Sequence, residues 1–284
     1  MNQSANTISP QNLPAPVPNV AATLSGEDFW QQRLSQREGL EGVGYTGLGL
    51  PFNRWIYRLR KAIFVREVSR LRLGLETASV LDVGSGTGFW LGVWKSLRVK
   101  SVSGSDITNV AVQNLTARFA DVTMYKLDIG SASTSPALAR QYDIVSAMDM
   151  LYHIVPEQDY ANAIANISNA IRPGGFFVFS ENLVHRETPP HPHQVNRTLH
   201  TITRELLRNG LHIQRRVPMA FFMNKPVDTR SNFPQTAWRI AMAPVRRFAA
   251  LGEIYGAVIF PIDWALTQIL AEGPSTELVI CQKQ

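Results

Sequence analysis

The stretch Val80-Leu81-Asp82-Val83-Gly84-Ser85-Gly86-Thr87-Gly88 decides the fold of this chain. An apolar run leads directly into a turn in which every second residue is glycine, and a helical pattern follows it. Glycine permits positive φ angles and lets a ligand approach the backbone closely, while the first turn of a helix presents free N–H groups. The stretch therefore predicts a strand, a ligand-binding turn and a helix in direct succession.

Strand and helix patterns alternate along the chain from this stretch onward. We expect strands at Ser79–Val83, Ser101–Asp106, Asp121–Leu127, Tyr142–Ala147, Gly175–Glu181, Leu211–Val217 and Thr276–Gln282. We expect helices between them at Gly88–Ser96, Val110–Phe119, Pro136–Gln141, Glu157–Ile171 and Thr201–Asn209. Such alternation predicts the α/β fold class, with a seven-stranded, mostly parallel, doubly wound sheet that carries helices on both faces.

The residues before this core divide into two parts. Residues 1–25 are rich in Pro, Asn, Ser and Ala and show no period, so we expect a disordered tail. Residues 26–75 are expected to form an N-terminal helical lid, which starts with a short helix over Glu27–Gln36 capped by Ser25. A glycine-rich loop over Gly42–Gly49 must bend sharply. The apolar residues after it recur at helical spacing and predict an amphipathic helix: Phe52, Trp55, Ile56, Leu59 and Ile63.

The core is expected to span residues 76–218, with residues 274–284 as its final strand. Between them, residues 219–273 break the alternation and are rich in Met, Phe, Trp and Pro. We expect this insertion before the last strand to build the pocket for the substrate, although ordinary core packing explains its composition equally well.

Composition limits the class of protein. The chain has 284 residues, of which 45% are hydrophobic and 18% charged, which suits one full-sized α/β domain. Its most apolar stretch, Ala257 to Ile262, is stopped by Asp263, so no transmembrane segment is expected. The first charged residue is Glu27, which excludes a basic targeting signal and favours a cytoplasmic location. A single cysteine, Cys281, excludes an internal disulfide and an iron–sulfur cluster.

The chain is basic, with a net charge of +6 and a pI near 9.7. Much of the excess lies in one segment, at Arg54, Arg58, Arg60, Lys61, Arg66, Arg70 and Arg72. These side chains would attract an acidic substrate, an anionic membrane surface or nucleic acid. A solvated helix face gives the same pattern, and this is the interpretation that we favour.

The spacing of the glycines bears on the ligand of the turn. A dinucleotide-binding turn would read G-x-G-x-x-G, whereas here glycines occupy positions 84, 86 and 88 and position 89 is phenylalanine. With its apolar strand, the acidic Asp82 and these alternating glycines, the sequence resembles the class I S-adenosylmethionine-dependent methyltransferases, closely over residues 76–182. The resemblance implies S-adenosyl-L-methionine as the cofactor and no metal.

The resemblance also implies which residues contact the cofactor. The turn supplies Asp82, Gly84, Ser85, Gly86 and Gly88. The end of the second strand supplies Asp106 for the ribose hydroxyls, with Ile107 beside it, and Asp128 and Ile129 after the third strand would meet the adenine. Met148 lies in the segment that lines the methionine end, and Tyr45 of the lid would meet the methionine carboxylate, although a plain turn explains Tyr45 equally well.

Methyl transfer from a sulfonium mainly requires that the acceptor be aligned behind the methyl group and lose its proton. His153, just past the fourth strand, is the best-placed candidate for the base, with Tyr152 to orient the acceptor. His153 would equally well shape the pocket without taking a proton. We also assign His185 and Phe222 to substrate binding. The nearby pair His191 and His193 lacks a supporting carboxylate or cysteine cluster, so we expect a surface loop there.

Some reactions are excluded. Amino methylation of DNA bases in this class uses an Asn/Asp-Pro-Pro-aromatic turn, and here the turn reads Ala147-Met148-Asp149-Met150; Cys281 is misplaced for pyrimidine C5 methylation. We therefore expect a small-molecule acceptor, with nucleic acid disfavoured, and methylation of a hydroxyl oxygen on a sugar, glycolipid, quinone or secondary metabolite. A cofactor-binding regulator without transferase activity, or an RNA or membrane-surface methyltransferase, are the alternatives, and the oligomeric state is open.

Overall fold

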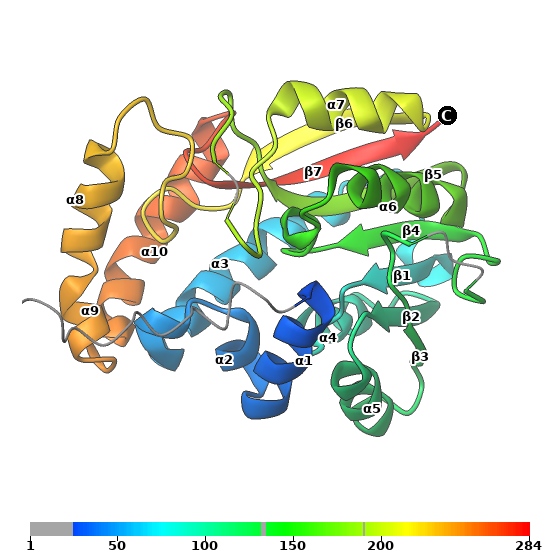
Figure 1. Ribbon diagram of the computed structural model, residues 1–284, viewed down its shortest axis with the longest axis horizontal. Helices are drawn as coiled ribbons and strands as arrows, with labels where there is room; N and C mark the ends of the chain where they lie inside the picture. The colour runs from blue at the N-terminus through cyan, green and yellow to red at the C-terminus, as the bar shows by residue number, and fades with distance from the viewer. Residues whose placement is uncertain (1–24, 132–134, 190) are drawn as a thin grey trace, which may run out of the picture.

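The computed structural model describes residues 25–131, 135–189 and 191–284. The expected tail therefore lies outside the described residues except for Ser25. A seven-stranded sheet with the order β3-β2-β1-β4-β5-β7-β6 forms the centre of the molecule (Figure 1). All neighbouring strands are parallel except that β7 runs antiparallel to both β5 and β6. The predicted fold class is confirmed. The strands are β1 (Ser79–Val83), β2 (Ser101–Asp106), β3 (Thr123–Lys126), β4 (Tyr142–Ala147), β5 (Ile171–Asn182), β6 (Leu211–Pro218) and β7 (Thr276–Lys283).

Alternate residues of each strand face opposite sides of the sheet and enter two separate apolar cores. On one side Val80, Ile144 and Val178 pack with α3 (Gly49–Val68), α4 (Phe89–Ser96) and α5 (Asn109–Arg118). On the other side Leu81 and Val145 pack with α6 (Glu157–Ala170) and α7 (Leu199–Arg208). Strands buried on both faces account for the nearly continuous apolar runs in the sequence.

One predicted helix is wrong. Residues 136–141 form a turn, in which the N–H of Leu138 donates to the main-chain oxygen of Ser135 at 2.9 Å. Because β4 begins at Tyr142, the segment has no room to add further helical turns. The strand β5 is longer than predicted and starts at Ile171, because Ile171 already pairs with Tyr142 across a bulge.

The N-terminal layer consists of α1 (Gly26–Gln36), α2 (Gly39–Val43), a 3₁₀ turn at Thr46–Leu48 and α3. The hydroxyl oxygen of Ser25 accepts a hydrogen bond from the N–H of Asp28 at 3.1 Å, which confirms the predicted cap. The glycine-rich loop is more regular than expected, since α2 ends within it and α3 begins at its last glycine. Short 3₁₀ turns also occur at Leu75–Thr77 and Leu151–His153.

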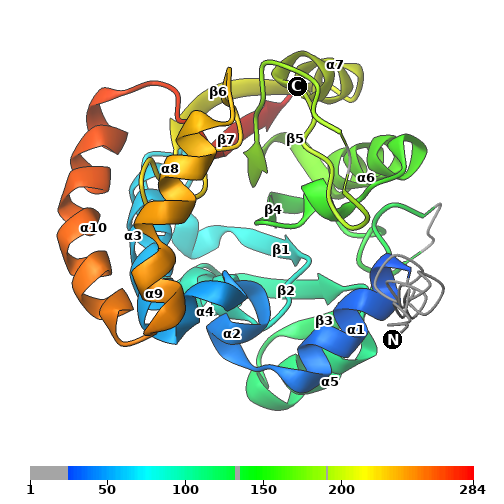
Figure 2. The ribbon, with the colours of Figure 1, turned by 60° about the vertical axis from the view of Figure 1, so that its left-hand side comes forward.

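The segment before β7 forms α8 (Phe233–Ala241), α9 (Ala243–Arg247) and α10 (Leu251–Ile269). In Figures 1 and 2, α10 lies along α3, which separates it from the sheet. Two glycines allow this close approach, because a Cβ atom at Gly252 would lie 2.7 Å from the nitrogen of Phe52 and one at Gly256 would lie 2.2 Å from the Trp55 ring. Within the described ranges, no helix combines the length and the apolar character needed to cross a membrane.

Candidate active site

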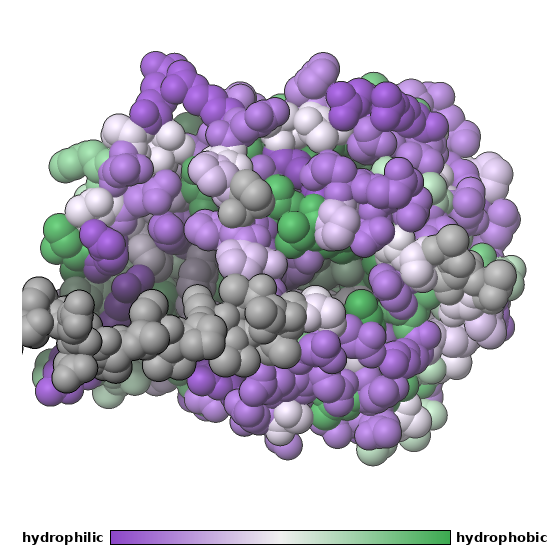
Figure 3. Space-filling model, viewed as in Figure 1, coloured by the Kyte–Doolittle hydropathy of each residue, from purple (hydrophilic) through white to green (hydrophobic). Residues whose placement is uncertain are grey.

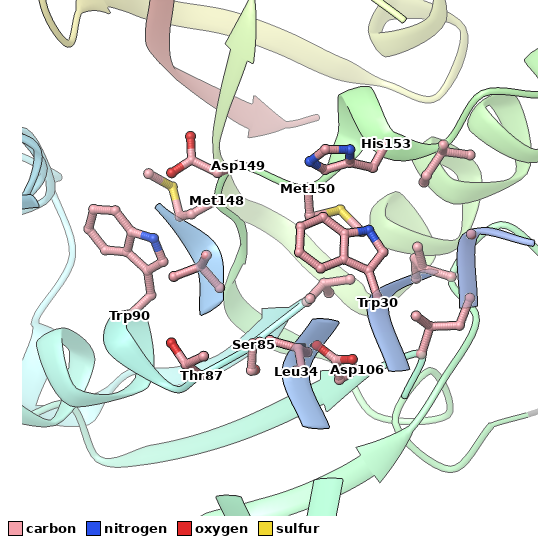
Figure 4. Close-up of a pocket in the computed structure, with 18 of the residues that line it drawn as sticks. Trp30, Leu34, Ser85, Thr87, Trp90, Asp106, Met148, Asp149, Met150 and His153 are labelled. Atoms are coloured by element: carbon pink, nitrogen blue, oxygen red, sulfur yellow. Dashed lines mark hydrogen bonds between the residues drawn. The ribbon is translucent and has the colours of Figure 1, made fainter. Parts of the chain in front are cut away.

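A cavity lies at the carboxyl ends of β1, β2 and β4, where ligands bind in open α/β sheets. Its empty volume is about 1030 Å³, open solvent at its mouth included, and we call it the first cavity. Helix α1 covers it with Trp30 and Leu34 (Figure 4). Of the residues predicted for the cofactor or substrate, it is lined by Gly84, Ser85, Gly86, Asp106, Ile107, Asp128, Ile129, Met148, Tyr152 and His153.

The glycine turn forms the floor of the first cavity. Gly84 and Gly86 have φ angles of +72° and +53°, which other residues rarely adopt. A Cβ atom on Gly84 would lie 2.9 Å from Met150, and one on Gly86 would lie 3.2 Å from Val43. Gly88 does not line the cavity: it caps α4 at φ +79°, and its missing side chain makes room for Leu115. The first two glycines therefore shape the ligand space, and the third serves packing.

Asp106 is held firmly beside this turn. One carboxylate oxygen accepts hydrogen bonds from the N–H and the hydroxyl of Thr108 at 2.9 and 2.8 Å, and the other accepts from the N–H of Gly86 at 2.8 Å. A carboxylate has about four acceptor positions, so capacity remains on the side of Asp106 that faces the cavity. Burial raises the pKa of Asp106, and these three hydrogen bonds lower it.

The far end of the first cavity is a narrow apolar slot with one polar edge. Ile107, Leu127 and Ile129 line it, and Leu127 and Ile129 are buried. Asp128 accepts a hydrogen bond from the N–H of Gly130 at 3.0 Å through Oδ1, which fixes the carboxylate at the edge of the slot. Such a slot suits a flat heteroaromatic ring with an amino group.

Asp82 lies behind the turn and does not line the cavity. The hydroxyl of Ser146 donates to its Oδ1 at 2.6 Å, and the hydroxyl of Ser85 donates to its main-chain oxygen at 3.0 Å. Its Oδ2 is buried without a hydrogen-bond partner among the described residues, and burial raises the pKa of Asp82 to about 7. In this position Asp82 ties the turn to β4, and its contact with the cofactor stays a prediction.

His153 lies at the opposite wall of the first cavity, in contact with the lid. Its Nδ1 is 2.7 Å from the main-chain oxygen of His193, so Nδ1 carries the proton and Nε2 keeps its lone pair. Trp30 packs edge-on against its ring, with 4.8 Å between the centroids, as Figure 4 shows. Burial lowers the pKa of His153 to about 4, so the imidazole is neutral near pH 7.

A second cavity adjoins the first. Its empty volume is about 1740 Å³, open solvent included, and Figure 3 shows the hydrophilic face that is hollowed beside α8. The residues that line both cavities form the wall between them: Trp30, Val43, Tyr57, Asp149, Tyr152 and His153. His153 and Tyr152 therefore lie where the two cavities adjoin.

Asp149 and Arg60 strengthen this wall. Asp149 has a φ angle of +57°, and its carboxylate lies 2.6 Å from the Arg60 guanidinium. Ser180 makes two hydrogen bonds to Asp149: its hydroxyl accepts from the N–H of Asp149 at 2.7 Å and donates to Oδ1 of Asp149 at 3.0 Å. The favoured interpretation of a solvated basic face is wrong for Arg60, which is only 7% exposed. The sequence spacing indicates this burial, because Arg60 follows Ile56 by four residues and precedes Ile63 by three, which places it on the apolar face of the helix.

Four other predicted residues lie outside the first cavity. Tyr45 lines the second cavity, away from the expected methionine carboxylate. His185 is exposed and pairs with Asp228 at 2.6 Å, and Phe222 is 53% exposed and donates its N–H to Asp263; neither lines the first or the second cavity. His191 lines the second cavity. Among the described residues, no group of three or more His, Cys, Asp or Glu side chains is arranged to hold a metal ion.

Comparison with known proteins matches this geometry. Residues 55–226 match the family model described as a methyltransferase domain. Ubiquinone biosynthesis O-methyltransferases of Pseudomonas savastanoi pv. phaseolicola and Nitrosomonas europaea are 32% and 30% identical to the chain over 111 and 128 residues. These matches cover 38% and 41% of this chain, and the chain spans about half the length of these relatives, 46% and 52%.

Solved structures share the fold. The N-methyltransferase NodS of Bradyrhizobium japonicum in complex with S-adenosyl-L-homocysteine superposes with a TM-score of 0.53 at 15% identity, over 91% of this chain and 98% of its own. The [4+2]-cyclase SpnF superposes with a TM-score of 0.52 at 18% identity, over 78% and 80%. The fold is the Rossmann-like fold of class I methyltransferases. The chain belongs to the methyltransferase-domain family.

Proposed function

We propose that the protein transfers the methyl group of S-adenosyl-L-methionine to a hydroxyl oxygen of a small polar acceptor. The observation that carries this proposal is the position of His153 in the wall between the two cavities, with its Nε2 lone pair unprotonated. The curated relatives named O-methyltransferases support the same reaction type. A cytoplasmic location and the exclusion of nucleic acid stay predictions from the sequence.

The residues of the first cavity fit an adenosyl group. The acceptor position that remains on Asp106 suits a ribose hydroxyl, and the apolar slot with Asp128 at its edge suits adenine and its amino group. Gly84 and Gly86 expose the bare backbone of the turn to the first cavity, with Met148 beside it, which suits the methionine end. When bound, S-adenosyl-L-methionine supplies a methyl group that is already activated by its sulfonium.

The chain's own residues then align the acceptor. The Nε2 atom of His153 accepts a hydrogen bond from the acceptor hydroxyl, which turns an oxygen lone pair toward the first cavity. Because its pKa is lowered to about 4, His153 is a weak base toward a free alcohol. As the oxygen donates its lone pair to the methyl carbon, the hydroxyl becomes more acidic, and its proton then passes to Nε2 of His153. Trp30 covers the junction and excludes water.

The lining of the second cavity indicates the class of acceptor. It is lined by side-chain amides and hydroxyls that suit a molecule with several hydroxyl groups: Asn182, Thr188, Gln194, Asn196, Thr229, Ser231, Asn232, Gln235 and Thr276. Lys225 and Arg230 are exposed there, and no carboxylate among the described residues pairs with either. We therefore favour a sugar-like acceptor with an acidic group over an apolar quinone.

Two of the predicted segments line the cavities. The proposed substrate-pocket insertion, residues 219–273, supplies Lys225, Val227 and Gln235 to the second cavity. The proposed lid, residues 26–75, covers the first cavity through Trp30 and Leu34. These placements support a division of labour in which the core holds the cofactor and the insertion selects the acceptor.

A second candidate function follows from the likeness to SpnF. That protein has this fold and is named a [4+2]-cyclase, so the fold alone does not decide that the bound cofactor loses its methyl group. Binding of S-adenosyl-L-methionine without its conversion would favour a cyclase or a regulator. Formation of S-adenosyl-L-homocysteine in proportion to methylated acceptor would favour methyl transfer.

The test is a transfer assay with S-adenosyl-L-methionine labelled in its methyl group. The acceptors are hexuronic acids, sugar phosphates, the corresponding neutral sugars and a dihydroxybenzoate. We expect the label in an acid-stable ether on an anionic sugar, and its loss in an Asp106→Ala variant. The Asp121→Ala variant is the matched control, because Asp121 is exposed at the surface beside Lys95. Cofactor binding without transfer to any acceptor class would contradict the proposal.

A further inference from the structure

The outer face of α10 is apolar although it faces solvent. Large apolar residues recur on it at helical spacing: Ile254, Val258, Ile262 and Ile269, which are 61%, 60%, 48% and 78% exposed, followed by Leu270 at 44%. From Ile254 to Ile269 this face extends about 22 Å at 1.5 Å per residue. Solvent-exposed helix faces normally carry charged residues, so such a face indicates a partner.

The opposite side of α10 is committed to the fold. Gly252 and Gly256 admit Phe52 and Trp55 of α3 at close range, and Asp263 is fully buried and accepts hydrogen bonds from the N–H groups of residues 221–223. Figure 2 shows α10 at the edge of the molecule with no element of the described chain outside it. The apolar outer face is therefore available for another surface.

Basic residues border this face. Arg58 of α3 lies over the Phe260 ring of α10 with 5.3 Å between the guanidinium carbon and the ring centroid, and Arg54 and Lys61 are exposed on the same helix. At the N-terminal end of α10, Arg247 lies over Phe248, and Arg246 precedes it. Within the described residues, no carboxylate forms an ion pair with any of these five side chains.

We propose that the outer face of α10, with its bordering basic residues, binds the protein to an anionic lipid surface. The apolar side chains would enter the boundary between headgroups and acyl chains, and the arginines would remain among the phosphates. The basic residues favour an anionic lipid surface over a second copy of the chain, because a dimer formed through this face would bring the unpaired cations of both copies together. The inference concerns a surface remote from the two cavities and does not depend on the proposed function.

The test is sedimentation of the full chain with vesicles. We use phosphatidylcholine alone and phosphatidylcholine mixed with phosphatidylglycerol, at low and at high salt. Binding is expected only to the mixed vesicles and is expected to fall as salt rises. The variants Val258→Glu/Ile262→Glu and Arg246→Gln/Arg247→Gln are expected to weaken it by about tenfold or more, since each cation near the surface contributes about 1 kcal/mol.

The control is Leu207→Glu, which adds one negative charge, half of that added by Val258→Glu/Ile262→Glu, at a residue of α7 that is 49% exposed. This control is expected to bind vesicles like the unaltered chain, and all variants are expected to keep their affinity for S-adenosyl-L-methionine. Absence of binding to the mixed vesicles would overturn the proposal. Equal weakening by the control would overturn it too, because general charge repulsion would then explain the result.

A fluorescent label tests whether lipid or another part of the protein covers this face. Ile262→Cys gives one reactive thiol, because the native Cys281 is fully buried. A polarity-sensitive dye there is expected to report water in the free protein and an apolar environment after the mixed vesicles are added. If the dye already reports an apolar environment without lipid, then a second copy or residues 1–24 cover the face and the proposal is wrong.

Discussion

Arg60 and Asp149 lie 89 residues apart in the sequence and form an ion pair with 2.6 Å between Nη1 and Oδ2. Their side chains are 8% and 13% exposed. The pair joins α3 to the segment after β4, at the wall that separates the first cavity from the second cavity. Asp149 has a left-handed backbone, and such strain persists where surrounding contacts hold it and often marks functional sites. The pair therefore links the stability of the lid layer to the shape of the site.

The variant Arg60→Met is expected to lower the free energy of unfolding by about 3 to 5 kcal/mol, because it leaves the Asp149 carboxylate largely buried without its partner. The double variant Arg60→Met/Asp149→Asn is expected to lose less than the single variant. Urea unfolding at pH 7 measures both. Arg58→Met is the control at an exposed position of the same helix. A double variant that is less stable than the single one would show that the pair is not the cause.

The fold could be predicted closely because local and global signals agree. The bounds of β1, β2 and β4 match the prediction residue for residue. β1 and β4 are short, mainly apolar runs, and each of the three strands ends at a polar or glycine-rich turn. The gathering of Gly84, Asp106 and Met148 in one cavity could also be predicted, because a parallel sheet brings the ends of β1, β2 and β4 to one edge. These are properties of sequence order and need no knowledge of packing.

The second cavity could not be predicted in the same way. Trp30, Arg60 and Asn232 come from three distant segments, and only tertiary packing brings them together. Tyr45 was expected at the cofactor because the sequence resembles a family in which an N-terminal lid covers the cofactor. Its position in the chain does not fix the direction of its side chain, which lies against Trp238 with 6.0 Å between the ring centroids.

Asp106→Ala is expected to weaken the binding of S-adenosyl-L-methionine by about tenfold to a hundredfold, the effect of one or two hydrogen bonds to a charged group. The loss should be shared by S-adenosyl-L-homocysteine, because the ribose is common to both. Isothermal titration calorimetry measures the two dissociation constants, and Asp121→Ala serves as the surface control. If Asp106→Ala binds both molecules with unaltered affinity, the ribose assignment is wrong.

Two glycine substitutions are expected to act in opposite directions. Gly84→Ala places a Cβ atom 2.9 Å from Met150 at a φ angle of +72°, so it should lower the free energy of unfolding by about 1 to 3 kcal/mol and weaken cofactor binding. Gly92→Ala lies within α4, where a Cβ atom meets nothing within 4 Å, so it should stabilise the protein by about 0.5 to 1 kcal/mol. Thermal unfolding and calorimetry compare the two. Gly84→Ala with normal stability and affinity would mean that the turn tolerates a side chain.

His153→Gln is expected to lower turnover by about 10² or more while the affinity for S-adenosyl-L-methionine stays within about twofold, since the residue acts on the acceptor. Because the pKa of His153 is about 4, the turnover of the unaltered enzyme should show no step from this residue between pH 5.5 and 8. Initial rates across this range check both statements. A step near pH 6.5 that disappears in His153→Gln would show that His153 titrates as an exposed imidazole.

The same lowered pKa makes His153 a source of acid sensitivity. In the unfolded chain histidine has a pKa of about 6.5, so between pH 6.5 and 4 the unfolded state binds a proton that the folded state does not. The stability contributed by the neutral imidazole is therefore complete above pH 6.5 and is lost as the pH falls toward 4.

Two buried carboxyls change the stability with pH in the opposite sense, because burial raises the pKa of Glu181 to about 8 and that of Asp82 to about 7. The unaltered chain alone therefore does not isolate the effect of His153. The carboxyls contribute equally to the unaltered chain and to His153→Gln, so their effect cancels in the difference between the two free energies of unfolding. From pH 7 to pH 4.5 the unaltered chain should lose about 2 kcal/mol more than His153→Gln. A difference that stays constant over this range would mean that His153 takes up its proton equally well in the folded protein, and the buried, neutral imidazole would then have to be abandoned.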